Sequence, residues 1–496
     1  MNAPAPTEAD VQGLKNFIGG AWVAGSGEAT IDLVDPTTET VIARQPAGSA
    51  ADADAAVGAA AAAQPAWSRL PLKDRLAALE RMADTLEKHI EELADLEYRE
   101  MGRPLDVGRD FLRMGIAVLR GSLEDARRYP FVEEVANDEA GQTVVVRHPL
   151  GVVAQIVPWN FTVTTVLLGL GPLLAAGNTV VLKPSEKAPL SAVRMVEVAG
   201  LPPGVLNLLL GDRRAGEPLA DHLGVRLVHF TGSVEAGRVV GVASARHLHR
   251  AVLELGGKDP VLIDADVDPR AVAAAVAFGA FVNTGQICTS MERIYVHRAV
   301  ADEFLDALVT QAREWTFGDG REPGVRMGPL VDERQRRIVH SHVTDAVARG
   351  ATVLIGGTIP DRPGFFYPAT VLTEVEDDML IMTEETFGPV APVRIVDDFD
   401  EALERASRSR FGLGATVYSN DLEHIERAHA LPAALVWVNQ WQGGGLAGTA
   451  EPTGESGLGA TGGRAAFDAA TRPVSIIRTA TTPHFRVPKE LPSTWS

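Results

Sequence analysis

The feature that most constrains the fold is a series of short apolar runs separated by segments of helical periodicity. Five such runs lie in the middle of the chain: Val152–Val157, Thr179–Leu182, Leu206–Leu210, Leu227–Phe230 and Ala251–Leu255. Apolar runs joined by helices are typical of a parallel sheet that is covered on both faces. A second alternation begins at Asp259 and extends through Val417 to Trp437–Asn439. We therefore predict an α/β fold with two doubly wound parallel-sheet domains.

One stretch within this region could be mistaken for a membrane span. No Lys, Arg, Asp or Glu occurs between Arg147 and Lys183, a length that could cross a bilayer. Prolines and glycines interrupt the stretch, so we interpret it as strand, loop, helix, turn and second strand. The chain has 46 basic and 65 acidic residues and a formal charge of −19. Because such a surface repels phosphate backbones and anionic lipids, we expect neither nucleic acid nor membrane as a partner.

Further elements are expected on either side of the alternating region. An alanine-rich helix follows Ala50, and helical periodicity continues over Asp74–Glu100. Gly141–His148 is polar and β-branched, which indicates an exposed strand or hairpin, and Val474–Arg478 is another strand candidate. The N-terminus has no export signal and the chain has one cysteine, so we expect a reducing, cytoplasmic location.

The single cysteine, Cys288, has two interpretations. A lone thiol forms no intramolecular disulfide and falls short of the ligand set of a structural zinc. It is either a small buried hydrophobic residue, the commoner case for a lone cysteine, or a nucleophile. The helical spacing of Ala271–Val282 is broken by Asn283 and Gly285, so we expect Cys288 on a turn after a helix. A Gly-Gln turn that presents the thiol favours the nucleophile.

Two polar residues at the ends of predicted strands could assist such a nucleophile. Glu254 is followed by two glycines and could act as a general base, or it could be a helix-capping or salt-bridged acid. Asn160 lies just past another strand, where its amide could donate to an oxyanion together with the backbone N–H of Cys288. The alternative for Asn160 is an Asx turn. The residues alone leave both questions open.

Other segments suit a dinucleotide. Lys183 and Glu186 close the second strand three residues apart, a spacing that suits ribose hydroxyls, and the carboxylate would repel a 2′-phosphate. NAD is therefore favoured over NADP. Phe230–Gly237 joins a strand to a helix through small residues, which leaves N–H groups for a phosphate, although this signal is weak. The G-x-G-x-x-G segment Gly457–Gly462 follows no clear strand, so we interpret it as a loop. The 12 histidines form no H-E-x-x-H pattern, and we expect no metal site.

Taken together, six motifs resemble those of the aldehyde dehydrogenase superfamily, in the same order, from about Phe17 to Arg478. They are Pro-Trp-Asn-Phe at 158, Lys-Pro-Ser-Glu at 183, Phe-Thr-Gly-Ser at 230, Glu-Leu-Gly-Gly-Lys at 254, Gly-Gln-Ile-Cys at 285 and Glu-Glu-Thr-Phe-Gly-Pro-Val at 384. The resemblance implies NAD-dependent oxidation of a small-molecule aldehyde to its acid, with water as the final acceptor. It also implies a homodimer or a homotetramer.

The resemblance implies a role for each matched residue. Cys288 would attack the aldehyde to give a thiohemiacetal and then a thioester, Asn160 would hold the oxyanion, and Glu254 would activate water. Lys183 and Glu186 match residues that bind the adenosine ribose. Glu385 and Phe387 match residues that position the nicotinamide ribose and ring. The residues that match cofactor contacts are Trp159, Lys183, Ser185, Glu186, Gly232, Ser233, Glu385 and Phe387.

The resemblance also implies a division of the chain. We expect a Rossmann-like NAD-binding domain formed by residues 13–129 and 150–256, and a catalytic domain formed by residues 257–465. Residues 130–149 and 466–485 would form an oligomerisation β-flap, and residues 486–496 a C-terminal tail. Two rival functions stay open. A CoA-acylating enzyme of this fold does not keep the Glu254 carboxylate, and a non-catalytic ligand-binding or structural member need not keep Cys288.

The segment that lines the aldehyde tunnel in this family departs from the pattern. Thr449–Pro452 stands where members have Pro-Phe-Gly-Gly, and Gln442–Gly445 lacks an aromatic residue. We expect these changes to widen the tunnel and to add carboxylates at Glu451 and Glu455. The run Cys288–Val296 is similar to the branch of lactaldehyde and related hydroxyaldehyde dehydrogenases, which favours a polar, hydroxy- or amino-aldehyde. The alternative is an aromatic aldehyde, and the predicted substrate pocket contains Phe161, Trp441 and Glu451.

Overall fold

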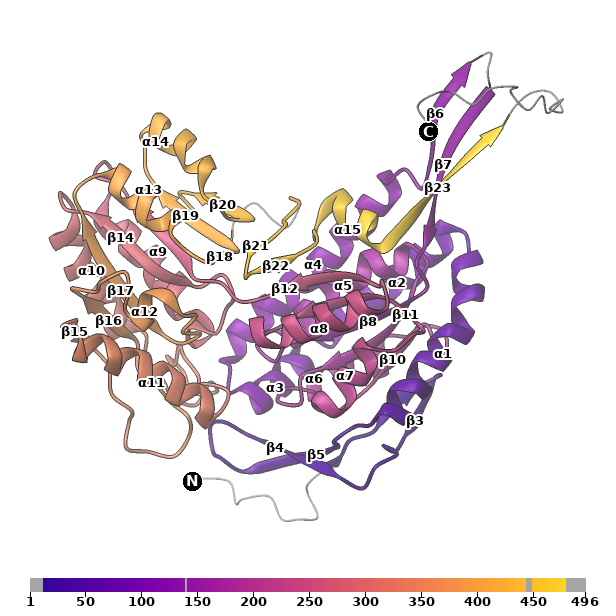
Figure 1. Cartoon of the computed structure of the whole chain (residues 1–496). Helices are drawn as coiled ribbons and strands as arrows, with labels where there is room; N and C mark the ends of the chain where they lie inside the picture. The colour runs from indigo at the N-terminus through magenta and orange to yellow at the C-terminus, as the bar shows by residue number, and fades with distance from the viewer. Residues whose placement is uncertain (1–11, 139–140, 443–447, 479–496) are drawn as a thin grey trace.

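The computed structural model of the chain describes residues 12–138, 141–442 and 448–478. Two α/β units lie side by side, and a narrow flap projects from one of them (Figure 1). The sheet of the first unit has the strand order β22-β12-β11-β8-β9-β10-β2-β3. Its strands are β2 (Asn16–Ile18), β3 (Ala21–Val23), β8 (Val152–Val157), β9 (Thr179–Pro184), β10 (Leu206–Leu208), β11 (Val225–Thr231), β12 (Arg250–Glu254) and β22 (Gly457–Leu458).

The five strands β8 to β12 are parallel, which confirms the sheet predicted from the apolar runs. The chain winds outward from β8 through β9 and β10, and then returns to β11 and β12 on the other side of β8. The topological switch point therefore lies between β8 and β11. In open α/β sheets, ligands bind in the crevice at the carboxyl ends of such strands. Pro158–Asn160 follows β8 and Gly232–Ser233 follows β11, so both motifs flank this crevice.

Helices cover both faces of this sheet and divide its core in two. Val153 and Val157 of β8 pack in one apolar cluster, and the intervening Val152, Ala154 and Ile156 pack in another, as the two-residue period of a strand requires. The second cluster includes residues of α1 (Ala50–Arg69), α7 (Arg213–Ala220) and α8 (Val234–Arg246). The first includes residues of α2 (Leu72–Lys88), α3 (Ile90–Met101), α4 (Leu105–Arg128), α5 (Thr162–Ala175), α6 (Leu190–Val198) and α15 (Gly463–Ala470).

The second unit is also doubly wound. Its sheet has the order β15-β16-β17-β14-β13-β19-β20, and all pairs except β15 with β16 are parallel. The strands are β13 (Asp259–Ile263), β14 (Met291–His297), β15 (Thr352–Ile355), β16 (Thr370–Thr373), β17 (Val390–Val396), β19 (Gly414–Tyr418) and β20 (Leu435–Val438). The accompanying helices are α9 (Pro269–Phe281), α10 (Ala301–Glu314), α11 (Glu333–Ala348), α12 (Leu380–Thr383), α13 (Phe399–Ser407) and α14 (Leu422–Arg427). The predicted fold class is thus confirmed.

The helical periodicity predicted over Asp74–Glu100 is confirmed, and it forms two helices, α2 and α3, because His89 between them leaves helical geometry (φ −103°, ψ 11°). One local prediction was wrong. The glycine-rich segment 457–462 is not simply a loop, since Gly457 and Leu458 form β22 and α15 begins directly after Gly462. Gly457 has φ +135°, and a side chain there would collide with the carbonyl of Leu253, so the pairing of β22 with β12 requires glycine.

The chain just before α15 joins both units. β21 (Thr453–Gly454) pairs with β18 (Phe411–Gly412) beside the second unit, and β22 pairs with β12 in the first sheet. Strands only a few residues apart in sequence therefore belong to different sheets. The boundary that we predict at residue 465 stays a prediction, as do the other domain bounds.

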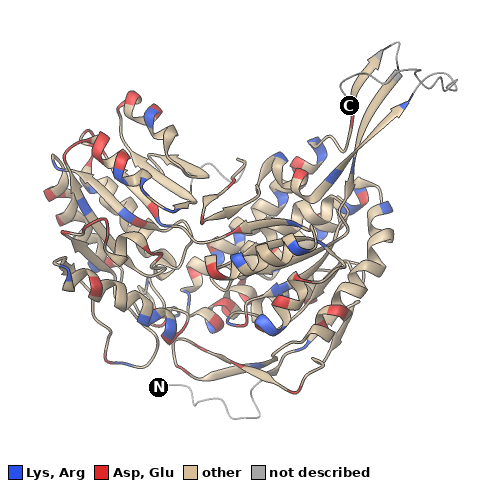
Figure 2. Ribbon diagram, in the orientation of Figure 1, with Lys and Arg blue, Asp and Glu red and all other residues tan. Residues whose placement is uncertain are grey.

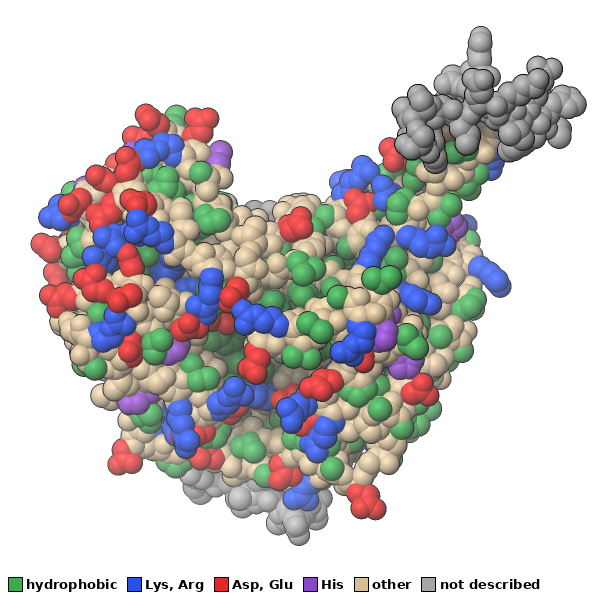
Figure 3. All heavy atoms as spheres, in the orientation of Figure 1, with side chains coloured by type: hydrophobic (Ala, Val, Ile, Leu, Met, Phe, Trp, Pro, Cys, Tyr) green, Lys and Arg blue, Asp and Glu red, His purple; other side chains and the backbone are tan. Residues whose placement is uncertain are grey.

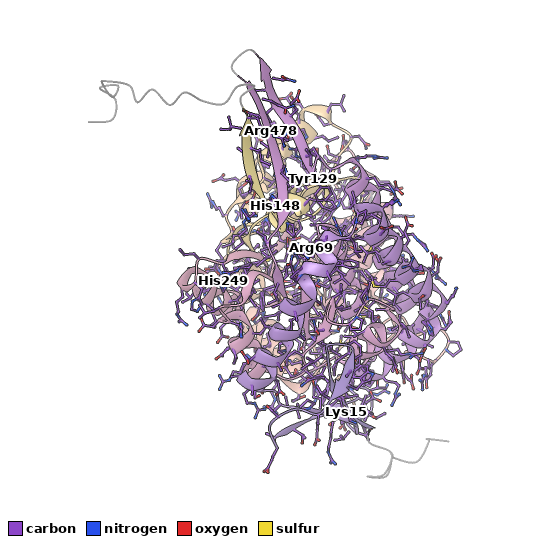
Figure 4. The ribbon with its side chains drawn as sticks, turned by 90° about the vertical axis from the view of Figure 1, so that its right-hand side faces the viewer. Lys15, Arg69, Tyr129, His148, His249 and Arg478 are labelled. Carbon is purple, nitrogen blue, oxygen red and sulfur yellow. The ribbon has the colours of Figure 1, made fainter. Side chains whose placement is uncertain are left out.

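The flap is a three-stranded antiparallel sheet in the order β23-β7-β6, formed by β6 (Val132–Asp138), β7 (Gly141–Pro149) and β23 (Thr471–Arg478). Figure 4 shows it rising from the body, with Tyr129 and His148 toward its base and Arg478 toward its tip. The remaining strands, β1 (Gln12–Gly13), β4 (Thr30–Val34) and β5 (Val41–Pro46), form a small N-terminal sheet. The predicted tail 486–496 lies outside the described residues.

Charged side chains of both signs are interspersed over the outer helices (Figure 2). Many form exposed ion pairs, such as that of Arg120 with Asp84 and Glu87. Each such pair contributes little to stability, so the packed cores carry most of it. In the part of the chain that the structure describes, no helix is long and apolar enough to span a bilayer.

Asn178 connects the flap to the first unit. Its side chain is fully buried, and Oδ1 accepts the backbone N–H groups of Leu150 (2.7 Å) and Gly151 (3.0 Å). Its Nδ2 donates to the carbonyls of Leu173 (3.0 Å) and Ala470 (2.9 Å). One amide thus satisfies four backbone groups, at the start of β8, at the end of α5 and at the entry to β23.

We expect Asn178→Ala to lower the midpoint of thermal unfolding by roughly 5 °C or more, because it leaves buried backbone groups without partners. Scanning calorimetry measures the shift. Asn137→Ala, which removes an exposed asparagine side chain, is the matched control and should move the midpoint by about 1 °C or less. Equal midpoints for the two variants would contradict the assignment.

Candidate active site

A cavity of about 2120 Å³ lies at the carboxyl edge of the first sheet and is bounded on its other side by loops of the second unit. Figure 3 shows this face of the molecule hollowed between the units, with Lys and Arg side chains near the hollow. All the predicted site residues except Trp441 and Glu451 line the cavity. The two parallel sheets therefore bring together residues that are up to about half the chain apart.

Cys288 lies on a tight turn, as predicted. α9 ends at Phe281, and Asn283 (φ +52°), Thr284 (φ +59°) and Gly285 (φ +68°) then take left-handed backbone conformations in succession. A side chain at Gly285 would collide with the carbonyl of Gly388, so glycine is required both for its φ and for this close approach. The strained turn directs the thiol into the cavity.

The electrostatic surroundings of Cys288 disfavour its thiolate. The side chain is half-buried, and burial raises the pKa of the thiol above its ordinary value. The carboxylates of Glu385, Asp259 and Glu254, in that order, raise this pKa further. Deprotonation therefore needs either a proton acceptor or a positive charge in the cavity.

Asn160 and Glu254 approach the same turn from the first sheet. The Asn160 Nδ2 donates to the carbonyl of Gln286, two residues before Cys288, at 3.0 Å. On the other side, Gly257 follows β12, and a side chain there would lie 2.5 Å from the Cys288 carbonyl. The carboxyl ends of β8 and β12 thus both contact the turn of residues 283–288, which we call the thiol turn.

Glu254 is the partly buried last residue of β12. Its Oε1 accepts a hydrogen bond from the Thr461 hydroxyl at 3.0 Å. Burial raises the pKa of Glu254 to about 7, and the Thr461 bond opposes that rise. A carboxyl group with this pKa is suited to general base catalysis near neutral pH. Sequence reasoning missed Thr461, which lies in the glycine-rich segment that we interpreted as a loop and had no signal of its own.

Glu385 and Phe387 face this group from the second unit. The Gly257 N–H donates to the Glu385 Oε1 at 3.0 Å, and burial raises the pKa of Glu385 to about 8. The Phe387 ring meets the Trp159 ring edge to face, with centroids 5.4 Å apart. These contacts bring the predicted nicotinamide-binding residues next to the loop that carries Asn160.

A buried carboxylate holds the segment 385–387 in place. Glu292 accepts the backbone N–H groups of Thr386 and Phe387, both at 2.8 Å, and pairs with the Lys258 ammonium at 2.6 Å. Lys258 belongs to a motif that we identified, but neither it nor Glu292 was assigned a role. Phe387 has φ +52°, a conformation that these bonds to the neighbouring backbone help to hold.

The opposite end of the cavity fits an adenosine diphosphate group. The Lys183 Nζ is buried and donates to the Pro184 carbonyl at 3.0 Å, which leaves ammonium donors for ligand hydroxyls. Burial lowers the pKa of Lys183, and the nearby Glu186 and Asp212 oppose this. Ser233 caps α8 by accepting the Ala236 N–H at 3.3 Å, so a helix N-terminus faces the crevice. Ser185, Glu186 and Gly232 also line this end.

The third wall is apolar. The Phe161 ring lies 4.3 Å from the Phe111 ring, centroid to centroid, and both line the cavity. Met114, Ala117, Val118 and Gly121 continue this apolar face of α4, with Leu168 of α5 alongside. Farther along α4 the cavity lining is polar and consists of Ser122, Glu124, Asp125 and Arg128. The Thr164 hydroxyl of this wall donates to the Phe111 carbonyl at 3.0 Å and is not free for a ligand.

The two predicted pocket residues outside the cavity lie elsewhere. The Trp441 Nε1 donates to the Thr289 carbonyl at 3.0 Å, and its ring packs against Phe278, so Trp441 braces the thiol turn. Glu451 is exposed, and its predicted role stays a prediction that this position does not favour. Glu455 pairs with Arg238 and Arg410 rather than adding a free carboxylate to the tunnel. Gly443–Gly445 lie outside the described residues.

The site combines a thiol, an amide donor and a carboxyl group that titrates near neutrality around one cavity. This set is suited to forming and hydrolysing an acyl-enzyme. Within the described residues, no group of three His, Cys, Asp or Glu side chains is placed to hold a metal ion. The predicted absence of a metal site stays a prediction.

Comparison with known proteins identifies the family. The model of the aldehyde dehydrogenase family matches residues 22–476. Phenylacetaldehyde dehydrogenase of Pseudomonas fluorescens is 37% identical over 504 residues, which cover 96% of this chain and 98% of that protein. The crystal structure of lactaldehyde dehydrogenase from Escherichia coli has a TM-score of 0.92 at 32% identity, over 95% of this chain and 100% of that one. Indole-3-acetaldehyde dehydrogenase, solved with NAD+, has a TM-score of 0.91 at 35% identity, over 94% and 96%. The chain therefore belongs to the aldehyde dehydrogenase family.

Proposed function

We propose that this protein oxidises an aldehyde to the carboxylic acid with NAD+, through a covalent thioester on Cys288. The observation that carries the proposal is the convergence of Cys288, Asn160 and Glu254 on one cavity whose far end suits a dinucleotide. Membership of the family and the NAD+ bound to indole-3-acetaldehyde dehydrogenase support the same reaction.

Each of the three residues has a distinct task. The Cys288 Sγ attacks the aldehyde carbon, and the Asn160 Nδ2 and the Cys288 backbone N–H donate to the resulting oxyanion. Lys183, Glu186 and Ser233 would hold NAD+, which would supply a hydride acceptor and a positively charged ring, so that the acyl group would remain on Cys288 as a thioester. The Glu254 carboxylate accepts the thiol proton during attack and releases it to solvent. In a later step it accepts a proton from the water that hydrolyses the thioester, and this proton returns to the departing Cys288 thiolate.

The positions of Glu186 and Glu254 argue against the rival reactions. Glu186 lines the adenosine end of the cavity, where its charge repels a 2′-phosphate, so NAD is the preferred coenzyme and NADP the poorer one. Glu254 is oriented by Thr461 toward a role as base for water, which a CoA-acylating enzyme does not need. A non-catalytic member has no use for a strained turn that presents a thiol.

The apolar wall supports the aromatic alternative for the substrate. Phe161, Phe111 and Met114 offer contact area but no free hydrogen-bonding group, whereas a hydroxyaldehyde needs polar partners. The relatives that act on phenylacetaldehyde and indole-3-acetaldehyde, by their names, agree with this preference. We therefore propose an arylalkyl aldehyde as the substrate class.

Self-association through the flap is part of the proposal. Val132 (65% exposed), Val135 (54%) and Ile477 (75%) are apolar residues of β6 and β23 that solvent reaches in the single chain. Exposed apolar surface of this kind is typical of an interface, which supports the homodimer or homotetramer expected from the family. The cytoplasmic location stays a prediction from the sequence.

A panel of aldehydes tests the proposed substrate class. We expect phenylacetaldehyde to exceed lactaldehyde in kcat/KM by at least about tenfold, or roughly 1.4 kcal/mol, because only the former covers the apolar wall. NADH formation at 340 nm measures kcat/KM for both aldehydes. In the same assay, kcat/KM with NAD should exceed that with NADP by a similar factor. Met114→Gln, which keeps the side-chain volume, should reduce the preference for phenylacetaldehyde. A higher kcat/KM for lactaldehyde would contradict the substrate class.

Cys288→Ala should abolish NADH formation while leaving NAD+ binding unchanged, because the thiol carries the covalent step and Lys183 and Ser233 bind at the other end of the cavity. Steady-state assays and quenching of tryptophan fluorescence by NAD+ measure the two properties. Substantial residual turnover would rule out Cys288 as the nucleophile.

The deacylation rate should rise with pH through the pKa of Glu254, which is about 7. The base is active only when ionised, so at pH 6 roughly one tenth of the molecules carry it and above pH 8 nearly all do. Rapid-quench measurement of thioester decay after the NADH burst separates this step from ionisation of the thiol. Glu254→Gln should slow decay by about 100-fold or more and remove the pH dependence. A pH profile unchanged by the substitution would exclude Glu254 as the base.

A further inference from the structure

Arg103 is a buried arginine that the proposed mechanism does not use. It follows the left-handed Gly102 (φ +66°) that ends α3, and its side chain is 1% exposed. Its Nη1 pairs with the Glu97 Oε2 at 2.6 Å, and Glu97 is 2% exposed. The guanidinium also stacks over the Phe161 ring, 4.6 Å from its centroid.

The remaining donors of Arg103 reach both loops of the active site. Its Nε donates to the Asn283 Oδ1 at 2.9 Å, and its Nη2 donates to the backbone carbonyl of Asn160. Asn283 is one of the left-handed residues of the thiol turn, and Asn160 carries the proposed oxyanion donor. One planar guanidinium therefore joins the loop after β8 to the turn after α9.

These two asparagines share an acceptor. The Asn283 Nδ2 donates to the Gln286 carbonyl at 3.1 Å, and the Asn160 Nδ2 donates to the same oxygen at 3.0 Å. The Gln286 Oε1 in turn accepts the Val331 N–H at 2.9 Å. Arg103 thus holds the backbone of Asn160 and the side chain of Asn283, while both amides converge on the residue two positions before Cys288.

We propose that Arg103 is a positioning residue that sets the Asn160 amide and the Cys288 turn in the geometry needed for oxyanion stabilisation. Arginine suits this role because its rigid fork places donors in fixed directions toward Glu97, Asn283 and Asn160 at once. The left-handed turn is costly, and bonds to Asn283 offset that cost. The proposal rests on the function proposed above, since it acts through Asn160 and Cys288.

The expected consequence is a loss in the chemical step rather than in binding. Arg103 does not line the cavity, so its removal should leave the KM for NAD within about twofold of the wild type. Loss of one oxyanion-hole donor costs roughly 10²–10³ in kcat, and misplacing such a donor should cost about 10- to 100-fold.

The central variant is the double substitution Glu97→Gln with Arg103→Met, because removing Arg103 alone would leave a buried unpaired carboxylate and could unfold the protein. We expect kcat to fall about 10- to 100-fold in this variant, and Arg103→Lys, which keeps the charge, to fall between it and the wild type. Added to Asn160→Ala, the double substitution should cause a smaller further loss of kcat than it causes in the wild type, because part of its effect acts through the Asn160 amide. Fully multiplying losses of kcat, or a kcat of the double variant within twofold of the wild type, would overturn the proposal.

Alkylation of Cys288 by iodoacetamide gives a second readout that needs no turnover, and the chain has one cysteine. Loosening of the turn should expose the thiol, so alkylation at 20 °C should be faster in the double variant although kcat is lower. Arg75→Met is the matched control, because Arg75 is also buried but donates to the carbonyls of Ala175 and Leu70, away from the cavity. It should lower the midpoint of thermal unfolding without changing kcat or alkylation.

The two readouts separate the two proposals. A wild type that alkylates readily but forms no NADH with any aldehyde of the panel would overturn the proposed function, whereas equal alkylation rates in the wild type and the double variant would overturn the positioning role.

Discussion

Parallel pairing of β8 with both β9 and β11 is the constraint on which the rest of the structure depends. Parallel strands end at one edge, and the crossover helices between them must cover the faces of the sheet. In this register Lys183 pairs with Ile156, and Glu254 pairs with Thr231, so the ends of β9 and β12 fall level with the loops after β8 and β11. Groups distant in sequence therefore meet without any of them contributing to the core.

Placing several carboxyl groups at the carboxyl edge of the first sheet has an electrostatic cost, which changes their pKa values. Glu254 and Glu385 are partly buried around one cavity, and desolvation raises the pKa of each, to about 7 and about 8. By contrast, the buried Glu292 is paired with Lys258 and holds the backbone of Thr386. The Glu292 carboxylate is thus neutralised by a cation, whereas Glu254 and Glu385 face the cavity. A positively charged ligand in the cavity would favour ionisation of these two carboxyl groups and of the Cys288 thiol at the same time.

Sequence reasoning predicted the parallel sheets and the turn at Cys288 because their signals are local: apolar runs for the strands, and Asn283 with Gly285 for the break after α9. The six motifs predicted most of the residues that line the cavity, since each motif lies at a strand end or a tight turn. Contacts between segments far apart in sequence left no such trace. Thr461 acts through one hydrogen bond to the distant Glu254, and Arg103 through hydrogen bonds to the distant Asn160 and Asn283. The pairing of β22 with β12 depends on a glycine that lies in no apolar run.

The segment before α15 shows how one stretch can affect both binding and chemistry. Its strands pair with each unit in turn, and Glu455 between them bridges Arg238 of α8 and Arg410 beside β18. The same segment supplies Thr461, which opposes the rise in the pKa of Glu254. This one segment therefore carries both the ion pairs of Glu455 between the units and the hydrogen bond of Thr461 to Glu254.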